Sequence, residues 1–290
     1  MKMKIRKILF HLGRILPDTI YISIIYFYHF HRFPNLCNPQ TYNEKLQWLK
    51  LHDRKPEYSM MVDKYLVKDY VAKVLGYKYI IPTIGVWEAV DEIDWESLPK
   101  QFVLKWNHDS GSIVICKDKS ILDIEKAKNE LRRNEKGNGY WYGREWPYKN
   151  VKPRIIAEQY MEDEDGELKD YKFFCFDGEV KAMFVATDRF NPNEDTKFDF
   201  FDKDFNHLPF TNGHPNATRP IKKPVNFELM KQLAGKLSKG CPHIRVDFYE
   251  INGRIYFGEL TLYHWSGFVP FDPPVWDKTF GDWLKLSDEK

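Results

Sequence analysis

The segment of residues 243–268, HIRVDFYEINGRIYFGELTLYHWSGF, constrains the fold more than any other part of the chain. Apolar and polar residues alternate on both sides of Asn252-Gly253, a dipeptide typical of the two-residue turns that join antiparallel strands. The segment is therefore predicted to form a two-stranded hairpin.

Two acidic residues of this hairpin, Asp247 and Glu259, are twelve positions apart. Glu259 and Thr261 project together because alternate residues of a strand share a face. With a two-residue turn, Asp247 would lie opposite Gly258 and point away from Glu259. A one-residue bulge or a three-residue loop would instead bring both carboxylates to one face. We therefore expect a bulge or an odd-numbered loop in this hairpin.

Carboxylate oxygens gathered on one sheet face are ligands that suit Mg²⁺, which completes its shell with waters and substrate phosphates. The same spacing also fits an acidic pair on a solvated sheet face, since hairpins with two acids are common. The spacing of Asp247 and Glu259 leaves both interpretations open.

Length and charge limit the classes of function. A chain of 290 residues can bury a sizeable core, as one large domain or as two to three smaller lobes. With 44 Lys and Arg against 42 Asp and Glu, the net charge of +2 gives no electrostatic reason to expect a nucleic-acid partner.

The N-terminal part has an uneven charge. No acid precedes Asp18, whereas five residues are basic: Lys2, Lys4, Arg6, Lys7 and Arg14. Residues 20–30, IYISIIYFYHF, are almost wholly apolar, but a bilayer requires about 20 residues, and no small-residue cleavage site follows. Residues 1–33 are predicted either to lie on an anionic membrane surface or to form a helix packed on the core.

The four cysteines are far apart in the sequence and form no CxxC pair: Cys37, Cys116, Cys175 and Cys241. This pattern argues against a zinc site or a disulfide framework and favours a cytoplasmic location.

Periodicity predicts an α+β protein with mainly antiparallel strands, because strands and helices do not alternate regularly. Helices are expected at residues 41–53, 56–75, 122–133 and 227–239. Strands are expected within residues 79–90, 101–118, 154–162 and 170–188, the last with a turn at Asp177-Gly178. Residues 137–146 and 189–224 are expected to be irregular, and these two segments are the predicted walls of an acceptor site.

A second candidate site lies within residues 102–115, FVLKWNHDSGSIVI. Two apolar strands flank a loop of small residues, and Lys105 stands near the end of the first strand. Glycine and serine let a backbone approach phosphates, and a nearby ammonium group complements their charge. GxxxxGK[ST] and GxGxxG motifs are absent, so the segment alone also fits an ordinary hairpin.

The order of the motifs resembles that of the ATP-grasp superfamily, and within it the TupA-like ATP-grasp family. The succession is a lysine-bearing helix (VDKYLVKDYVAKVLG), the strand and loop just described, IIAEQYMEDEDGE, DYKFFCFDGEVKAMFVATDR, and Asp247 with Glu259-x-Thr261. The resemblance covers about residues 38–284 and includes NPQTYNEKLQWLKLHDR and GELTLYHWSGF. The family is named for teichuronopeptide synthesis and is typical of gene clusters for cell-surface polysaccharides.

The resemblance implies an ATP-grasp fold, in which two α+β lobes with mainly antiparallel sheets enclose ATP. We expect four parts: an N-terminal helical segment (1–37), a helical and strand region (38–101), a small lobe (102–160) and a large lobe carrying the metal-binding hairpin (161–290).

The resemblance also implies the ATP-binding residues. Lys64 and Lys105 would contact phosphates. The loop that would cover them comprises Asp109, Ser110, Gly111 and Ser112. The hinge beside the adenine edge would comprise Glu158, Gln159, Tyr160 and Met161. Glu164, or less favourably Glu162, would hold the ribose.

The metal and the reacting groups are implied in the large lobe. Asp247 and Glu259 would hold one or two Mg²⁺, with Thr261 at a position where the superfamily usually has Asn. Three basic residues would lie near the transferred phosphate and acyl group: Lys172, Arg189 and Arg245. His108 and His264 are interpreted as packing or substrate-contact residues rather than catalytic bases.

The implied activity is that of a carboxylate–amine ligase. Such enzymes move the γ-phosphoryl group of ATP onto a carboxylate, and an amine then attacks the acyl phosphate. We expect an amino acid or amino sugar to be joined to a uronic acid of a surface glycan, in the cytoplasm or at the inner face of the membrane. No GxSxG motif is present, and the mechanism requires no covalent nucleophile.

Two alternatives come from other classes. Asp202-Lys203-Asp204 is a DxD triplet, by which many glycosyltransferases hold a metal and a nucleotide sugar. The aromatic content and basic N-terminus would also fit a non-catalytic glycan-binding module. That reading leaves Lys105 and the Asp247/Glu259 pair unexplained.

Overall fold

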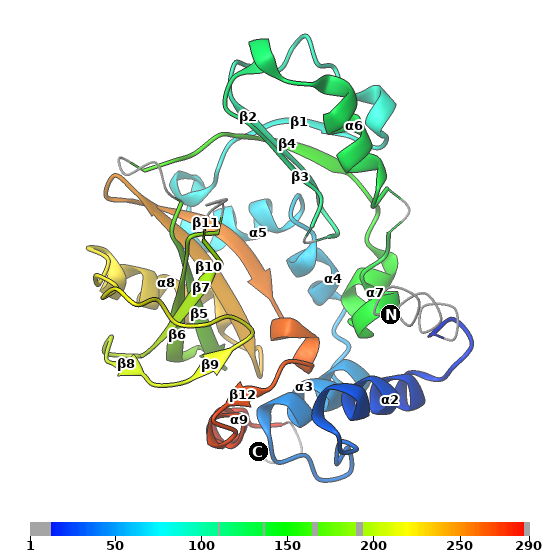
Figure 1. Ribbon diagram of the computed structural model, residues 1–290, viewed down its shortest axis with the longest axis vertical. Helices are drawn as coiled ribbons and strands as arrows, with labels where there is room; N and C mark the ends of the chain where they lie inside the picture. Colours follow the sequence, from blue (N-terminus) through cyan, green and yellow to red (C-terminus); the bar gives the residue numbers. More distant parts are fainter. Residues whose placement is uncertain (1–12, 110, 136, 164–167, 190–193, 287–290) are drawn as a thin grey trace.

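The computed structural model describes residues 13–109, 111–135, 137–163, 168–189 and 194–286. Figure 1 shows a smaller lobe at one end and a larger lobe at the other, each with its own sheet. Each lobe has a separate apolar core. Ser110 and Glu164, both predicted to contact the nucleotide, lie outside the described residues.

The smaller lobe contains a four-stranded antiparallel sheet in the order β1-β4-β2-β3. Its strands are β1 (Thr83–Trp87), β2 (Phe102–Trp106), β3 (Ile113–Cys116) and β4 (Ile155–Gln159). Helix α6 (Ile124–Arg132) buries Ala127 and Leu131 against this sheet. The indole of Trp106 donates to the carbonyl of Leu131 at 2.8 Å and ties the end of the helix to β2.

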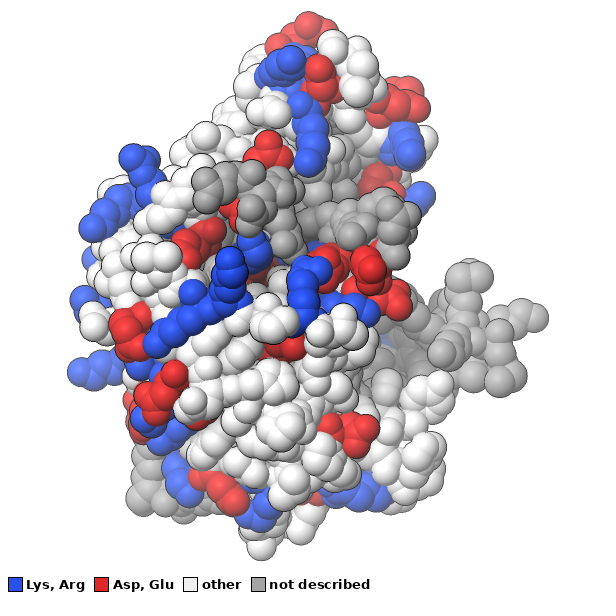
Figure 2. Space-filling model, turned by 60° about the vertical axis from the view of Figure 1, so that its left-hand side comes forward, with Lys and Arg blue, Asp and Glu red and all other residues white. Residues whose placement is uncertain are grey.

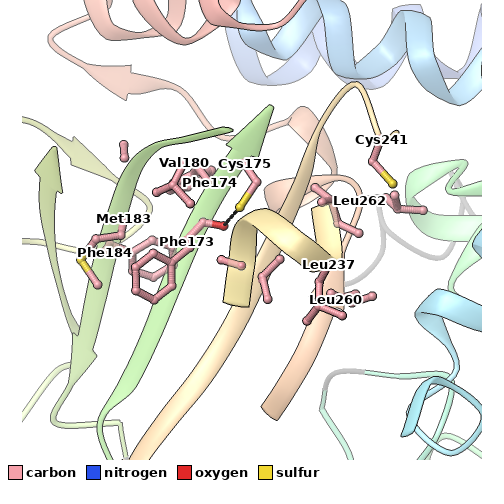
Figure 3. Close-up of a cluster of buried hydrophobic side chains, with 14 of the residues drawn as sticks. Phe173, Phe174, Cys175, Val180, Met183, Phe184, Leu237, Cys241, Leu260 and Leu262 are labelled. Carbon is pink, nitrogen blue, oxygen red and sulfur yellow. Dashed lines mark hydrogen bonds between the residues drawn. The ribbon is translucent and has the colours of Figure 1, made fainter. Parts of the chain in front are cut away.

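The larger lobe contains a six-stranded antiparallel sheet in the order β11-β10-β5-β6-β7-β8. Its strands are β5 (Asp170–Phe176), β6 (Glu179–Thr187), β7 (Lys197–Asp202), β8 (His207–Leu208), β10 (Ile244–Ile251) and β11 (Arg254–Thr261). The short strands β9 (Thr211–Asn212) and β12 (Phe271–Asp272) pair separately. Helix α8 (Phe227–Ser238) brings Leu237 into the core, where it joins Phe173, Val180 and Leu260 (Figure 3).

The remaining helices also belong to the larger lobe or border it: α2 (Asp18–Phe30), α3 (Tyr42–His52), α4 (Glu57–Val62), α5 (Val67–Leu75), α7 (Tyr140–Gly143) and α9 (Val275–Trp283). Helix α3 begins with a capping box in which Thr41 and Glu44 satisfy each other's backbone amides. Asn43 binds Asp277 of α9, so the N-terminal helices are held against the end of the chain.

The structure corrects three sequence predictions, the first being that residues 137–146 are irregular, since they include α7. The predicted helix at 56–75 is interrupted, because the Asp63 carboxylate accepts from the backbone N–H groups of Tyr65 and Leu66 and closes a turn. The predicted irregular segment at 189–224 contains β7, which is buried on both faces and therefore lacks the alternation that would reveal a strand.

Candidate active site

The predicted irregularity in the β10–β11 hairpin is confirmed. Asp247 pairs with Glu259 and Phe248 pairs with Phe257, so Gly258 is the extra residue of a bulge. A Cβ atom at Gly258 would lie 3.2 Å from the carbonyl oxygen of Asp247. Asp247 and Glu259 consequently occupy facing positions and share one side of the sheet.

The next strand extends this polar face. Asp247 is paired with Lys172 of β5, and Tyr249 is paired with Asp170. The ammonium group of Lys172 binds the Asp247 carboxylate and lies 3.1 Å from Asp170. Acidic and basic groups therefore alternate across the floor between the two lobes.

Arg245 joins the three predicted metal ligands. Its guanidinium donates twice to Asp247, at 2.7 Å each, and also to Glu259 at 2.8 Å and to Thr261 at 3.0 Å. The bidentate pair with Asp247 is a strong, directional interaction.

These acids form an oxygen donor set that fits Mg²⁺. The Asp247 side chain is fully buried, whereas that of Glu259 is 33% exposed. Burial would raise the pKa of Glu259, but Lys172, Lys64 and Arg245 hold it below its usual range. Burial raises the pKa of Asp247 against the opposing effect of Arg245 and Lys172. Within the described ranges no cluster of three or more His, Cys, Asp or Glu side chains is placed to hold a metal, so the two acids would need phosphate and water ligands beside them.

His264 holds the far side of Arg245. Its Nδ1 lies 2.8 Å from Nη1 of Arg245, and its Nε2 lies 2.9 Å from the side-chain oxygen of Asn212. The amide nitrogen of Asn212 donates to the carbonyls of Val269 and Pro270, both at 3.1 Å. These contacts make Nδ1 the acceptor and Nε2 the donor. Burial, reinforced by Arg245, lowers the pKa of His264 well below its usual value, so the ring is a neutral acceptor.

Basic groups from β2 and from the region of α5 gather on the smaller lobe's side of the cleft. Lys105 of β2 and Lys68 of α5 contact the two oxygens of Glu158 at 2.5 and 2.7 Å. Burial would raise the pKa of Glu158, but Lys105 and Lys68 hold it below its usual range. The ammonium group of Lys64 donates to the backbone carbonyl of Asp109 at 2.5 Å, and burial lowers its pKa. Lys64 thus anchors the predicted covering loop.

The described part of that loop is tied to Asn134, just after α6. The amide nitrogen of Asn134 lies 2.9 Å from Asp109 and 2.7 Å from Ser112. Gly111 is nearby, since a Cβ atom there would lie 3.9 Å from the same nitrogen. Asn134 therefore links the loop to the helical side of the smaller lobe.

A cavity of about 470 Å³ lies between the lobes. Its apolar lining comes from both: Ile81, Val103, Ile113, Ile115, Leu168 and Phe257. The rest of its lining includes Lys105, Arg189 and the predicted hinge residues Glu158, Gln159, Tyr160 and Met161, followed by Glu162. A cavity that combines apolar side chains with convergent polar groups is typical of a small-molecule or cofactor site.

Arg189 connects this cavity to the acidic floor by binding the carboxylate of Asp170. Asp170 is 1% exposed, and its Oδ1 has no hydrogen-bond partner in the described part of the chain. Figure 2 shows Lys and Arg side chains gathered across the middle of one face, just below the smaller lobe.

A model of the family described as TupA-like ATPgrasp matches residues 44–285, which is most of the chain. The protein belongs to the TupA-like ATP-grasp family. This confirms the resemblance found in the motifs and the expected two-lobed α+β fold.

Several solved structures are similar to this TupA-like protein at low identity. One is D-alanine–D-alanine ligase from Bacillus anthracis complexed with ATP, with 14% identity and a TM-score of 0.40, covering 70% of this chain and 55% of that one. D-cycloserine synthetase DcsG has 18% identity and a TM-score of 0.39, covering 71% of this chain and 64% of that one. The biotin carboxylase domain of 2-oxoglutarate carboxylase from Hydrogenobacter thermophilus has 16% identity and a TM-score of 0.41, covering 70% of this chain and 40% of that one. The chain thus spans about 55% of the length of the first of these ligases. No curated protein matches the chain.

The structure brings together most predicted site residues and adds others. Lys105, Arg189 and the hinge residues line the cavity, and Lys172, Arg245, Asp247, Glu259 and Thr261 form the floor. Sequence reasoning missed Lys68, Asn134 and Asp170. Only Asp170 had a usable signal, because it precedes Lys172 by two positions on the same strand.

The DxD triplet of this TupA-like protein closes a turn. Asp202 accepts from the backbone N–H groups of Asp204 and Asn206 at 2.9 and 2.8 Å at the end of β7. Asp204 is paired with Lys203 at the surface. The triplet therefore has a local structural role that needs no metal.

Proposed function

We propose that this protein is an ATP- and Mg²⁺-dependent ligase that joins a carboxylate to an amine. The observation that carries the proposal is the bulge at Gly258, which places Asp247 and Glu259 together on the floor of a two-lobed cleft. The adenine would enter the apolar cavity beside residues 158–161, and the phosphates would extend toward that floor.

The reaction has two balanced steps. A carboxylate oxygen of the substrate attacks the γ-phosphorus as the bond to the β-phosphate oxygen breaks, giving ADP and an acyl phosphate. The amine then attacks the acyl carbon, phosphate leaves, and the amine nitrogen loses a proton.

The chain's own residues position these groups and balance their charge. Lys105 and Lys64 would bind phosphates, and Arg245 and Lys172 would face the oxygens on which negative charge develops. Mg²⁺, held by Asp247 and Glu259 with Thr261 beside them, would neutralise charge on the β- and γ-phosphates.

The proposed substrate is a uronic acid in a surface glycan or its lipid-linked precursor, and the proposed amine is an amino acid or amino sugar. The resemblance to a family associated with surface polysaccharides supports this substrate class. A carboxylate-bearing sugar also supplies the group that the phosphoryl transfer requires.

Calorimetry with a non-hydrolysable ATP analogue, with and without Mg²⁺, tests the nucleotide and metal sites. We expect Mg²⁺ to tighten binding to the wild type, and Asp247→Asn and Glu259→Gln to remove this effect. Asp202→Asn is the matched control, because Asp202 is an acid of the same lobe outside the cleft lining. Retention of the Mg²⁺ effect in both cleft variants would disprove the metal assignment.

Release of ADP in the presence of uronic acids and amino acids tests the substrates. We expect turnover to require both components and to be lost in Glu259→Gln. Hydrolysis of a UDP-sugar without ATP would instead support the glycosyltransferase alternative.

We also propose that the protein contacts the membrane surface through α2. One face of this helix is buried against the core through Tyr21, Ile22, Ile25 and Tyr26. The opposite face exposes Ile20 (49%), Ile24 (41%), Phe27 (46%) and Tyr28 (51%). At 3.6 residues per turn, these four positions fall within about 100° around the axis.

Charge supports an anionic bilayer as the partner of this face. Asp18 is the sole acid in the first 43 residues, and it is paired with Arg54 and Arg144. The five basic residues before Pro17 would add attraction to anionic lipids. No described helix is both long and apolar enough to cross a bilayer.

Co-sedimentation with vesicles tests this contact. We expect binding to vesicles containing phosphatidylglycerol, weaker binding to pure phosphatidylcholine, and loss of binding in the double variant Ile24→Ser/Phe27→Ser. Val225→Ser is the control, since Val225 is 91% exposed and lies outside α2. The proposal would be overturned if the wild type bound no vesicles and instead formed a dimer that the double variant dissociates.

A further inference from the structure

Trp265 is a large aromatic residue left open to solvent beside a buried catalytic floor. Its side chain belongs to the short helix η5 (His264–Gly267) and is 39% exposed, whereas the neighbouring residues His264 and Phe268 are buried. Exposure of an indole in this position is unusual, because tryptophan normally buries most of its surface.

The backbone around Trp265 is strained. Trp265 and Ser266 have φ values of 50° and 53°, and Gly267 follows at 61°. Residues other than glycine seldom adopt this left-handed conformation, and two in succession are rarer still. Such strain persists where the surrounding structure enforces it, and it is concentrated at functional sites.

Two buried side chains of α3 enforce the conformation. Lys50 donates to the carbonyl of Ser266 at 2.6 Å and to that of Gly143 at 2.7 Å. Gln47 donates to the carbonyls of Ser266 and Gly267 at 3.0 and 2.7 Å. Both side chains are fully buried, so the turn that carries Trp265 is fixed before any ligand binds.

The indole is also fixed in orientation. It stacks on Phe198 with ring centroids 6.0 Å apart and planes 21° apart, and His214 lies 5.8 Å away. Gly213 allows close approach of the ring, because a Cβ atom there would lie 2.8 Å from the indole nitrogen. Trp265 is therefore a rigid surface with part of its ring left open.

This surface adjoins the reacting groups. The preceding residue, His264, binds Arg245 at 2.8 Å. The guanidinium of Arg245 lies 5.7 Å from the ring of Phe184, which in turn contacts Phe198 beneath the indole at 4.5 Å. Two rings, Phe198 and Phe184, thus separate Trp265 from Arg245 along this route, whereas the ring of His264 alone, 5.7 Å from the indole, separates them along the other.

We propose that Trp265 is the platform on which a pyranose ring of the acceptor stacks. The C–H face of a pyranose is apolar and flat enough to cover an aromatic ring, and its polar rim remains free for hydrogen bonds. Stacking on Trp265 directs the sugar carboxylate toward Arg245. This inference rests on the proposed function and adds the subsite that selects a sugar over a small amino acid.

Saturation-transfer NMR with D-glucuronic acid, D-galacturonic acid and their short oligomers tests the platform directly. Wild type, Trp265→Ala, Trp265→Phe and the control Tyr77→Ala are compared, Tyr77 being 75% exposed and absent from the cleft lining. We expect saccharide binding in the wild type and control, a loss of at least tenfold in Trp265→Ala, and recovery of most of it in Trp265→Phe.

Binding of the ATP analogue by the same four proteins distinguishes failure of the Trp265 platform from failure of the proposed glycan substrate. Trp265→Ala should bind the nucleotide like the wild type, which also shows that it is folded. Equal saccharide binding by Trp265→Ala and wild type would overturn the platform and leave the glycan substrate intact. A wild type that binds nucleotide but none of the saccharides would overturn both the platform and the glycan substrate.

Discussion

Arg245 makes more contacts with the floor of the cleft than any other cation described there, and His264 is what fixes its remaining edge. Because Nε2–H donates to the side-chain oxygen of Asn212, Nδ1 can only accept from Arg245. A neutral acceptor orients Arg245 without placing a negative charge beside its guanidinium. We therefore assign His264 a positioning role.

His264→Ala should lower kcat by about 10- to 100-fold, the usual effect of removing a group that orients a reacting residue. Affinity for the ATP analogue should be unchanged, because His264 does not line the cavity. His264→Asn should recover much of the rate, since its side-chain oxygen can replace Nδ1 as the acceptor. Equal loss in both variants, or a fall in nucleotide affinity, would contradict the positioning role.

His243 should make the fold sensitive to acid. Tyr42 donates to its Nε2 at 2.8 Å, its Nδ1 donates to the carbonyl of Cys175 at 3.2 Å, and burial lowers its pKa to about 3. Between about pH 6.5 and pH 3 the unfolded chain binds a proton here that the folded chain does not. Stability from this group is thus complete above pH 6.5 and is lost as the pH falls, by about 2 kcal/mol at pH 5.

The comparison that isolates this effect is thermal unfolding of wild type and His243→Gln from pH 7.5 to pH 4.5. Glutamine can keep both hydrogen bonds but does not titrate. The variant should lose less stability on acidification, and parallel curves for the two proteins would show that His243 is not responsible.

The meeting of two acids within one hairpin could be predicted from the sequence, whereas contacts between residues of separate elements could not. Asp247 and Glu259 lie on adjacent strands, so strand parity shows that a shared face requires a bulge or an odd-numbered loop. Lys68 and Lys105 meet on Glu158 only through the packing of α5 against the smaller lobe. No local pattern indicates such a meeting.

In the β10–β11 hairpin, the bulge at Gly258 is what brings Asp247 and Glu259 to the same face. Without the bulge at Gly258, strand parity would send Asp247 and Glu259 to opposite faces. The turn contains only Asn252 and Gly253, with φ values of 50° and 75°, because Ile251 pairs with Arg254. The shift in strand pairing therefore occurs at Gly258 and not in the turn.

Deletion of Gly258 should therefore abolish the Mg²⁺ effect on nucleotide binding. The deletion restores regular pairing and turns Glu259 away from the floor or shifts the strand. Gly258→Ala is the control: its Cβ atom meets the Asp247 carbonyl at 3.2 Å, a contact that small shifts relieve, so the Mg²⁺ effect should remain. Circular dichroism establishes that both variants are folded. A folded deletion variant that keeps the effect would show that the bulge is not needed.

Tertiary contacts explain where the predicted elements differ from those observed. The turn at Asp63 that divides α4 from α5 is reinforced by Asn107, whose side chain donates to Asp63 at 2.9 Å from the smaller lobe. Strand β7 is held between β6 and β8 with Phe198, Phe200 and Phe201 all buried. The contact from Asn107 is distant in sequence, and the burial of β7 removes the apolar–polar alternation that marks a strand, so periodicity revealed neither feature.

The two lobes have separate cores and meet across the cavity. The smaller core gathers Phe102, Leu104 and Trp106 around α6, and the larger core surrounds the six-stranded sheet. Because the cavity is lined from both sides, a ligand that fills it binds only when the lobes are apposed. Nucleotide binding should therefore couple the unfolding of the two lobes.

Scanning calorimetry should show two overlapping transitions in the nucleotide-free protein, because separate cores need not unfold together. With Mg²⁺ and the ATP analogue at about 100 times Kd, binding stabilises the folded protein by about 2.7 kcal/mol, and both transitions should rise and merge. Lys105→Met removes the proposed phosphate contact of the smaller lobe alone, yet it should reduce the shift of both transitions. If this variant reduced the shift of the smaller lobe only, the ligand would not bridge the lobes, and each would bind its part of the nucleotide independently.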